Sequence, residues 1–250
     1  MKTEWDYSDL AEAYLQRPDY SDAAIDELLA STGLEAGARV CDVGAGVAHL
    51  TLKLLQRGLE VSPVEPNDEM RARGQKRTAA WPRVSWVEGT GEHTQQPDDA
   101  FDLVTFGSSF NVVDQAAALR ESSRILKPQG WFACMWNHRD LDDPLQAAIE
   151  SAIAARIPDY AYGRRREDQT VAIEASGLFG EVSRISGGIT HQQSLQDCLE
   201  AWRSHGTLHR QAGQQFEAVI GDIEAVLRES GLAVIDIPYT TQVWLAGLRN

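Results

Sequence analysis

The sequence has little of what several classes of protein require. Its 250 residues include three cysteines, Cys41, Cys134 and Cys198, which are odd in number and far apart. This spacing argues against a disulfide framework or a cysteine metal site and favours reduced, buried thiols. No apolar run approaches the ~20 residues of a membrane span, and the N-terminus lacks the basic region and apolar core of a signal peptide. We therefore expect a cytoplasmic protein without a membrane partner.

Basic residues are also scarce. Lys and Arg number 23 against 37 Asp and Glu, which gives a formal net charge of −14. Phosphate contacts dominate affinity for nucleic acids, so this charge argues against a nucleic-acid partner. The one basic cluster, Arg164-Arg165-Arg166, is flanked by acids and is typical of a solvated loop. The chain shows no repeat or long linker, and its length suits one large α/β domain. The sequence leaves the oligomeric state open.

One stretch organises the rest of the chain. Residues 39–43 are mostly apolar and predict a short buried strand, which ends at Gly44-Ala45-Gly46. Residues 50–56 then show helical spacing of leucines. Glycines allow a sharp turn and a close approach of a ligand to the backbone, and a helix N-terminus offers N–H groups and a positive dipole end. The pattern predicts a ligand site at a strand–turn–helix junction.

The next predicted strand, 59–64, leads to Glu65, which lies 21 residues after Gly44. In a βαβ unit an acid at this place accepts hydrogen bonds from the hydroxyls of a ribose. A dinucleotide site carries G-x-G-x-x-G, but His49 stands where the third glycine would be. A nicotinamide-dependent oxidoreductase is therefore the alternative interpretation and not the first one.

Residues 42–48, Asp-Val-Gly-Ala-Gly-Val-Ala, resemble the first motif of the class I S-adenosylmethionine (SAM)-dependent methyltransferases. That motif is an acid two residues before G-x-G-x-G, and Ala48 replaces its last glycine here. Residues 98–104, Asp-Asp-Ala-Phe-Asp-Leu-Val, and the turn Lys127-Pro128-Gln129-Gly130 are similar to later motifs of the family. The motifs follow one another in the order that the family shows.

Two further stretches resemble a subgroup of this family, the trans-aconitate methyltransferase-like and natural-product enzymes. Residues 14–20 match its Tyr-x-x-Arg-Pro-x-Tyr pattern, and residues 136–140 match Trp-Asn-x-Arg-Asp. The chain departs from the subgroup at Asn111-Val112, where the relatives usually carry a His-Trp pair. The resemblance implies that residues 14–20 close over the cofactor.

The resemblance implies an α/β fold. It has three Rossmann-like layers around a seven-stranded, mostly parallel sheet whose last strand is antiparallel, with helical lid additions. The chain would be a single domain, 1–250, with an N-terminal helical lid (1–33), a SAM-binding core (34–140), and acceptor-side helices with the last two strands (141–250). Sequence patterns predict further strands at 84–87, 101–106, 131–136, 179–189 and 240–248, and helices at 8–17, 22–30, 114–126, 144–157, 170–175, 194–211 and 216–229.

The resemblance also assigns a cofactor, S-adenosyl-L-methionine, which would leave as S-adenosyl-L-homocysteine (SAH). Met70 would lie against the adenine, since a thioether suits an aromatic face. The loop at 90–92 would meet the adenine edge. The residues that would bind the cofactor are Tyr14, Arg17, Gly44, Ala45, Gly46, Glu65, Pro66, Met70, Thr90, Gly91, Glu92, Gly107 and Ser108.

The expected reaction is methyl transfer to an oxygen or nitrogen nucleophile of a small-molecule metabolite. Alignment of the nucleophile and exclusion of water would supply most of the catalysis. His138, expected just past a strand, is the first candidate for a general base and Tyr14 the second. The alternative is that His138 packs beneath the following loop. A non-catalytic SAM-binding protein is the third interpretation of the whole chain.

Two smaller hypotheses concern the acceptor side. Trp202, His205 and His209 would share one face of the helix predicted at 194–211, where two histidines suit a metal. No acid completes a known metal pattern, so core packing or lid contacts are favoured and no metal is expected. Arg17, Arg139 and the arginines at 164–166 would suit a carboxylate acceptor through bidentate bonding.

Overall fold

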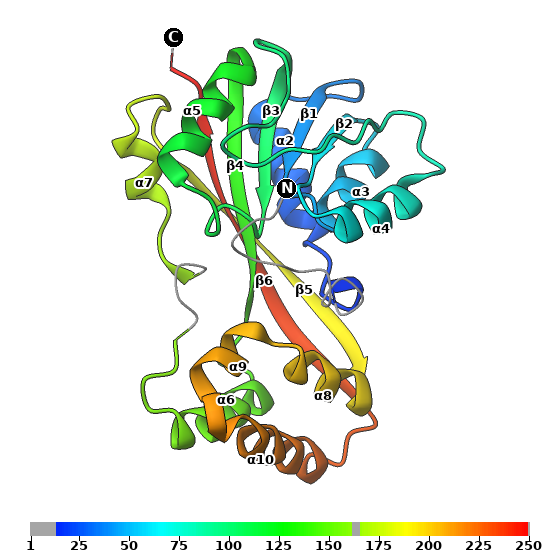
Figure 1. The fold of residues 1–250 in the computed structure, drawn as a ribbon, viewed down its shortest axis with the longest axis vertical. Helices are drawn as coiled ribbons and strands as arrows, with labels where there is room; N and C mark the ends of the chain where they lie inside the picture. Colours follow the sequence, from blue (N-terminus) through cyan, green and yellow to red (C-terminus); the bar gives the residue numbers. More distant parts are fainter. Residues whose placement is uncertain (1–13, 162–165, 250) are drawn as a thin grey trace.

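The computed structural model describes residues 14–161 and 166–249. Its centre is a six-stranded sheet in the order β2-β1-β3-β4-β6-β5, in which β6 runs antiparallel to both neighbours (Figure 1). The predicted helix at 8–17 falls largely outside the described residues. The strands are β1 (Arg39–Val43), β2 (Glu60–Val64), β3 (Phe101–Gly107), β4 (Leu126–Arg139), β5 (Ser183–Ser194) and β6 (Val234–Gly247).

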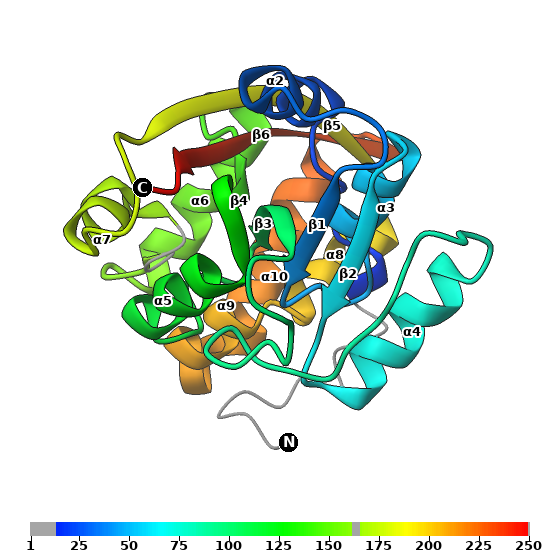
Figure 2. The ribbon, with the colours of Figure 1, turned by 90° about the horizontal axis from the view of Figure 1, so that it is seen from above.

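Helices cover both faces of the sheet and build a second layer beneath it. Alternation of side chains along the buried strands sends Val40 to one face and Cys41 to the other. Helices α2 and α3 pack on the first face and α5 and α7 on the second (Figure 2). The helices are α2 (Asp22–Thr32), α3 (His49–Gln56), α4 (Asp68–Thr78), α5 (Gln115–Ile125), α6 (Pro144–Arg156), α7 (Thr170–Ala175), α8 (Leu195–Arg203), α9 (Gly206–Ala212), η3 (Gly213–Gln215) and α10 (Phe216–Glu229).

The fold confirms the predicted α/β class and the antiparallel strand, with one difference in the sheet. The strand predicted at 84–87 is present as two isolated bridges, from Val84 to Val61 and from Val87 to Val64. Backbone N–H groups of Ser85 and Val87 donate to β2, but Pro63 has no N–H to continue the ladder. The sheet therefore has six full strands and a hydrogen-bonded edge segment instead of seven strands.

The strands at the other edge are longer than predicted or shifted. The apolar run of β4 stops at Trp136, yet the strand continues to Arg139, because Asn137, His138 and Arg139 pair with 239–241 of β6. The prediction that this strand ends at residue 136, with His138 just past it, was therefore wrong. Strands β5 and β6 likewise extend to Ser194 and back to Val234. This part of the strands carries polar side chains, so a hydrophobic pattern does not predict it, although the backbone pairing continues.

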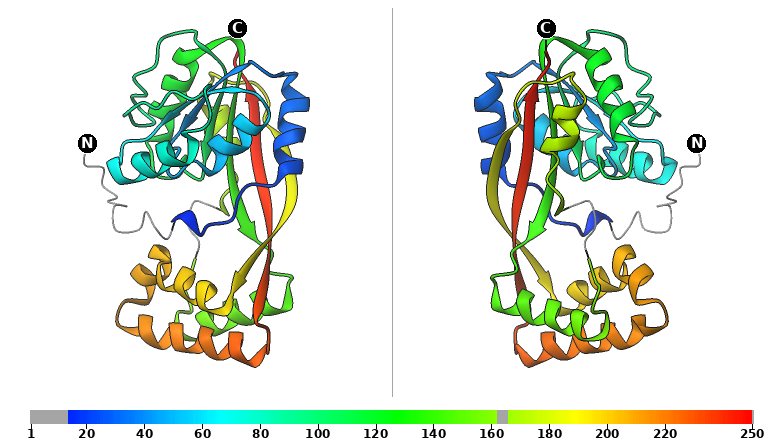
Figure 3. Two further views of the ribbon diagram at one scale, coloured as in Figure 1. Left: turned by 90° about the vertical axis from the view of Figure 1, so that its right-hand side faces the viewer. Right: turned by 90° about the vertical axis from the view of Figure 1, so that its left-hand side faces the viewer.

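These three long strands carry the second layer of helices. Helices α6, α8, α9 and α10 lie below the parallel part of the sheet, at the far ends of β4, β5 and β6 (Figures 1 and 3). They share a separate apolar core that includes Ile149, Trp202, Ile220 and Ile235. We call this layer, together with the far ends of β4, β5 and β6 that carry it, the helical half, and we call the parallel sheet with its flanking helices the cofactor half. Among the described residues, no helix is both long and apolar enough to cross a membrane.

The prediction of a single helix at 194–211 was wrong, because the structure has two helices in this range. Helix α8 ends at Arg203, and His205 caps α9 by accepting a hydrogen bond at 3.1 Å from the Leu208 N–H. The break separates Trp202 from His209, whose ring packs against Phe216 at a centroid distance of 4.7 Å. The part of the chain that the structure describes contains no cluster of three His, Cys, Asp or Glu suited to a metal ion.

Candidate active site

One cavity of about 1150 Å³ lies where the parallel strands end and extends to the helical half. Its walls include strand ends of the sheet and residues of α8 and α9. Every residue selected from the sequence for cofactor binding or as a general base lines it, so the structure brings together positions that are up to 124 residues apart, from Tyr14 to His138. They are Tyr14, Arg17, Gly44, Ala45, Gly46, Glu65, Pro66, Met70, Thr90, Gly91, Glu92, Gly107, Ser108 and His138.

The glycines of the first turn serve two different needs. The Gly44 N–H donates to the Val64 carbonyl at 2.8 Å, which ties the turn to β2. A Cβ at Gly44 would lie 2.5 Å from that of Ser109, so this glycine makes room for a protein side chain. Gly46 has φ +55°, and a Cβ there would meet nothing within 4 Å. Gly46 therefore leaves open space beside the cavity, as the approach of a ligand requires.

Glu65 places a carboxylate opposite this turn. Its Oε2 accepts from the Gly46 N–H and its Oε1 from the Asn67 N–H, both at 2.8 Å. Burial raises the pKa of Glu65, and these two backbone donors act against that rise. Each carboxylate oxygen keeps a second lone pair. The carboxylate can therefore accept hydrogen bonds from the hydroxyls of a ribose while it keeps both hydrogen bonds to the backbone.

Asp42, which lines the cavity beneath the turn, holds the surrounding elements together. Its buried carboxylate accepts from the Thr51 hydroxyl at 2.6 Å and from the Thr105 hydroxyl at 3.1 Å. Burial raises the pKa of Asp42 to about 6 despite these hydroxyl donors. The acid of the first motif thus clamps α3 and β3 to β1. This contact explains why an acid precedes the glycine turn.

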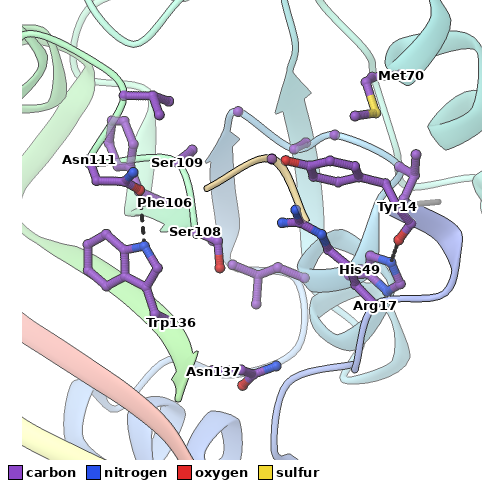
Figure 4. A pocket seen from close by; sticks show the side chains of 18 of the residues that line it. Tyr14, Arg17, His49, Met70, Phe106, Ser108, Ser109, Asn111, Trp136 and Asn137 are labelled. Carbon is purple, nitrogen blue, oxygen red and sulfur yellow. Dashed lines mark hydrogen bonds between the residues drawn. The ribbon is translucent and has the colours of Figure 1, made fainter. Parts of the chain in front are cut away.

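The segment at 14–20 forms one wall of the cavity. The Arg17 guanidinium lies 3.6 Å from the centroid of the Tyr14 ring. His49 holds this segment in place, with Nε2 at 2.8 Å from the Tyr14 carbonyl and Nδ1 at 2.7 Å from the Asp19 carboxylate. Figure 4 shows Tyr14 and Arg17 across the cavity from Ser108 and Trp136. The residue that breaks the dinucleotide motif therefore anchors the segment that borders the site.

Ser108 and Met70 complete the cofactor half of the cavity. Ser108 has φ +59° at the end of β3, a conformation that costs energy for a side chain other than glycine. It is held there by the Met135 carbonyl, which accepts its N–H at 2.8 Å, and by the Tyr20 hydroxyl at 2.9 Å. Gly107 is required next to it, since a Cβ there would lie 2.9 Å from that hydroxyl. Met70 is buried against Val47 and Tyr14.

The loop at 90–92 is tied to the start of α5. Glu92 Oε1 accepts from the Asp114 N–H at 2.8 Å, and the Thr90 hydroxyl accepts from the His93 N–H at 3.2 Å. A Cβ at Gly91 would lie 2.8 Å from Val113, so this glycine is needed for packing. The second carboxylate oxygen of Glu92 adds a hydrogen-bond acceptor to this part of the cavity wall.

His138 sits on the rigid end of β4 and not in a loop. Its backbone pairs with Thr240, and the neighbouring Asn137 links three parts of the chain. The Asn137 amide donates to the Asp19 carbonyl at 2.9 Å and accepts from the Thr241 hydroxyl at 2.6 Å. Trp136 donates to Asn111 at 3.1 Å (Figure 4). The strand thus fixes where His138 borders the cavity.

Sequence reasoning missed most of the helical half of the cavity. The residues that line this part of the cavity are scattered over β5, β6, α8 and α9 and share no sequence motif. The spacing of Trp202, His205 and His209 along the predicted helix favoured core packing or lid contacts over a metal site and did not identify an acceptor-binding residue. The missed lining residues include Gln16, His191, Gln193, Thr207, Arg210 and Tyr239.

Comparisons with known proteins agree with this geometry. Residues 41–134 match the family model of a methyltransferase domain. An uncharacterized methyltransferase of Mycobacterium tuberculosis (strain ATCC 25618 / H37Rv) is 39% identical over 124 residues, 50% of this chain and 48% of that protein. A ubiquinone/menaquinone biosynthesis C-methyltransferase of Proteus mirabilis is 32% identical over 128 residues, 48% of this chain and 51% of that protein. The chain spans about half the length of the curated relatives it matches.

Solved structures show the same fold over nearly the whole chain. A putative type II methyltransferase from Anaeromyxobacter dehalogenans has a TM-score of 0.63 at 16% identity, covering 93% of this chain and 97% of that one. A putative methyltransferase from an antibiotic biosynthesis pathway of Anabaena variabilis has a TM-score of 0.60 at 18% identity, covering 91% and 98%. The fold of this chain is the fold of these two methyltransferase structures. Within it, residues 41–134 match a methyltransferase domain.

Proposed function

We propose that this protein transfers the methyl group of SAM to an oxygen or nitrogen nucleophile of a small molecule. The observation that carries the proposal is the pairing of Gly46 and Glu65 at the ends of β1 and β2, inside a methyltransferase domain. The cavity of about 1150 Å³ exceeds the usual range of roughly 300–1000 Å³ for one small ligand. It is large enough for a cofactor and an acceptor together.

Residues of the cofactor half would hold SAM. Glu65 would accept hydrogen bonds from the ribose hydroxyls, and Gly46 and the N-terminus of α3 would receive the amino-acid chain of the cofactor. Met70 and the loop at 90–92 border the adenine, while Tyr14 and Arg17 cover the other side. When bound, SAM supplies a methyl group attached to a positively charged sulfur. On transfer of the methyl group the carbon–sulfur bond breaks, and the sulfur becomes the neutral thioether of SAH.

The protein's own contribution is alignment of the acceptor and exclusion of water. Such positioning can lower the barrier by roughly 7–11 kcal/mol. Where the nucleophile carries a proton at neutral pH, His138 takes it, because imidazole accepts protons in this range. Tyr14 is the second candidate for this role. Both side chains border the cavity, as a general base must.

The rest of the chain is divided by function in this proposal. Residues 34–140 hold the cofactor and 141–250 shape the acceptor site. Of the predicted N-terminal lid, 1–33, residues 14–20 border the cavity, but α2 packs on the sheet and is no part of a lid. The trans-aconitate-like and natural-product enzymes, which residues 14–20 and 136–140 resemble, offer one model for such an acceptor site. The net charge of −14 and the scarcity of cysteine support a cytoplasmic enzyme that does not act on nucleic acid.

Turnover tests the proposal against its two rivals. The protein is incubated with SAM and a panel of acids, amines and phenols, and SAH is quantified. We expect acceptor-dependent SAH formation, together with calorimetric binding of SAM and SAH. Binding of SAM with no turnover across the panel favours a non-catalytic SAM-binding protein. Binding of NAD without binding of SAM would establish the oxidoreductase alternative instead.

A further inference from the structure

The segment at 14–20, which forms one wall of the cavity, is fixed to the sheet at its C-terminal end. The N–H of Ser21, the residue that follows the segment, donates to the Thr241 hydroxyl of β6 at 2.8 Å. Asn137 at the end of β4 donates to the Asp19 carbonyl at 2.9 Å. These contacts use amide, carbonyl and hydroxyl groups, which keep their protonation state near neutral pH.

The imidazole of His49 connects this fixed end of the segment to its N-terminal end. Its Nδ1 lies 2.7 Å from Oδ1 of Asp19, and its Nε2 lies 2.8 Å from the Tyr14 carbonyl oxygen (Figure 4). The His49 side chain is 13% exposed, and that of Asp19 is 48% exposed. One largely enclosed ring therefore bridges the two ends of the segment.

Both oxygens that face the ring are hydrogen-bond acceptors. A carbonyl oxygen can only accept, and the Asp19 carboxyl is ionised, because its hydrogen bond with His49 holds its pKa below the usual range despite the opposing effect of burial. A neutral imidazole has one N–H donor and one lone pair, so either tautomer would set a lone pair against an oxygen. The imidazolium form donates from both nitrogens, as this arrangement requires.

We infer that His49 is a positioning residue for the cofactor, whose imidazolium form holds the segment at 14–20 in place as a wall of the cavity. Loss of one ring proton removes one of the two hydrogen bonds and loosens this wall. The hold is complete at acidic pH and is lost as the pH rises past the range in which imidazole titrates. The inference rests on the proposed function for the identity of the cofactor, while the contact itself is a property of the chain alone.

Other charges around the ring limit the size of this effect. His49 is the first residue of α3, and the positive end of a helix dipole disfavours a cation there. The Asp19 carboxylate opposes that influence, whereas neighbouring cations add to it. The charged and titratable groups nearest the pair are Tyr14, Arg17 and Asp19 of the segment, Lys53 of α3, Arg77 of α4 and His191 of β5. We therefore expect a change of about threefold to tenfold and not a complete loss of the wall.

Hydrogen exchange of two nearby amides tests the inference in the full chain without any ligand. The Arg17 N–H donates to the Tyr14 carbonyl at 3.2 Å within the segment, and the Ser21 N–H bound to β6 serves as the reference. Exchange is measured by NMR at about pH 5.5 and about pH 8, on either side of the imidazole range, and corrected for the intrinsic effect of pH. Protection of Arg17 should fall about threefold to tenfold at the higher pH, and that of Ser21 should not change.

Matched variants assign the pH dependence to one ring. In Asp19→Asn the amide N–H can donate to Nδ1 of a neutral His49, so protection should persist without pH dependence. His49→Gln should give low protection at both pH values. His191→Gln is the control, because its contact with the Gln16 carbonyl at 3.1 Å needs a single N–H, and the pH dependence should therefore remain. Should His49→Gln fail to fold in thermal unfolding, Asp19→Asn carries the same test.

Calorimetric titration of SAH at both pH values connects the wall to the cofactor. Raising the pH should weaken SAH binding to the wild type about threefold to tenfold more than binding to Asp19→Asn. No binding of SAH at either pH contradicts the proposed function, and hydrogen exchange still tests the role of His49.

Three results would overturn the inference. The first is equal protection of the Arg17 N–H at both pH values in the wild type. The second is the same pH dependence of this protection in the wild type, Asp19→Asn and His49→Gln. The third is pH-dependent protection together with an SAH affinity that responds to pH equally in the wild type and Asp19→Asn, which would remove the positioning role.

Discussion

The two halves of the cavity are built on different principles. In the cofactor half, backbone groups and tight packing decide the geometry, as at Gly44 against Ser109 and at the Glu65 carboxylate between two N–H groups. In the helical half, long strand ends and helices present side chains, among them Arg139 and Trp202. The first kind of site admits few residue types at each position. The second kind admits many, so it can change its ligand without changing its fold.

We expect the largest effect on SAM affinity from a substitution in the glycine turn of the cofactor half. Gly46→Val would place a branched side chain at φ +55° in open space beside the cavity, where the cofactor has to approach. We expect SAM affinity to fall more than about a hundredfold in calorimetry. Gly177→Val is the matched control, since Gly177 also has positive φ and open space but lies outside the cavity lining. A folded Gly46→Val protein with normal affinity would remove the turn from the site.

The next prediction concerns His138, at the junction of the two halves, where a substitution should change kcat but not SAM affinity. His138→Ala should lower kcat by ~10²–10⁴ if the imidazole accepts the proton, with little change in SAM affinity. His209→Ala is the control, because that ring packs against Phe216 and does not line the cavity. A loss below about tenfold, with a flat rate profile between about pH 6 and pH 8, would leave alignment as the whole mechanism.

A third prediction concerns the acid that clamps the cofactor half. The pKa of Asp42, about 6 when folded, lies above its ordinary value of 3.8, so the folded state holds this proton more tightly than the unfolded state. The stability from this group is therefore full below the ordinary value and is lost as pH rises through 6. Relative to Asp42→Asn, the wild type should lose on the order of 3 kcal/mol between about pH 4 and pH 7 in denaturant unfolding.

Asp102 supplies the control for this pH dependence. Burial alone would raise its pKa, but hydrogen bonds from Lys127 and the Arg39 N–H hold it below its usual value. Stability from this carboxylate is therefore present above the ordinary pKa and lost as pH falls through the lowered one. Asp102→Asn should change the profile below about pH 4 and with the opposite sign. Identical pH profiles for wild type and Asp42→Asn would contradict the raised pKa of Asp42.

The smallest effect sharpens the role of one carboxylate. Glu65→Ala removes the acceptor for the ribose hydroxyls, a hydrogen bond to a charged group that contributes about 1.5–3 kcal/mol. SAM affinity should fall about tenfold to a hundredfold by calorimetry. Glu60→Ala, an exposed acid at the start of the same strand, should leave it unchanged. Equal affinities of the two variants would take Glu65 out of the site.

The same contrast explains what the sequence could predict. The glycine turn and the acid after β2 were predictable because a positive φ and a buried carboxylate each demand particular residues. Neither the end of β4 at Arg139 nor the break between α8 and α9 was predictable from hydrophobicity. Pairing with β6 sets the end of β4, and the His205 cap sets the break between α8 and α9. Side chains that meet only in three dimensions, such as Arg139 and Trp202, leave no local pattern.

A crystal structure of the SAH complex tests the central claim most directly. We expect SAH in the cofactor half, with its ribose hydroxyls in hydrogen-bond contact with Glu65 and its amino-acid chain beside Gly46. Its sulfur should face the junction near His138, which leaves the helical half open for the acceptor. SAH bound in the helical half, or a Glu65 carboxylate without contact to the ribose, would contradict the division of the cavity and the function derived from it.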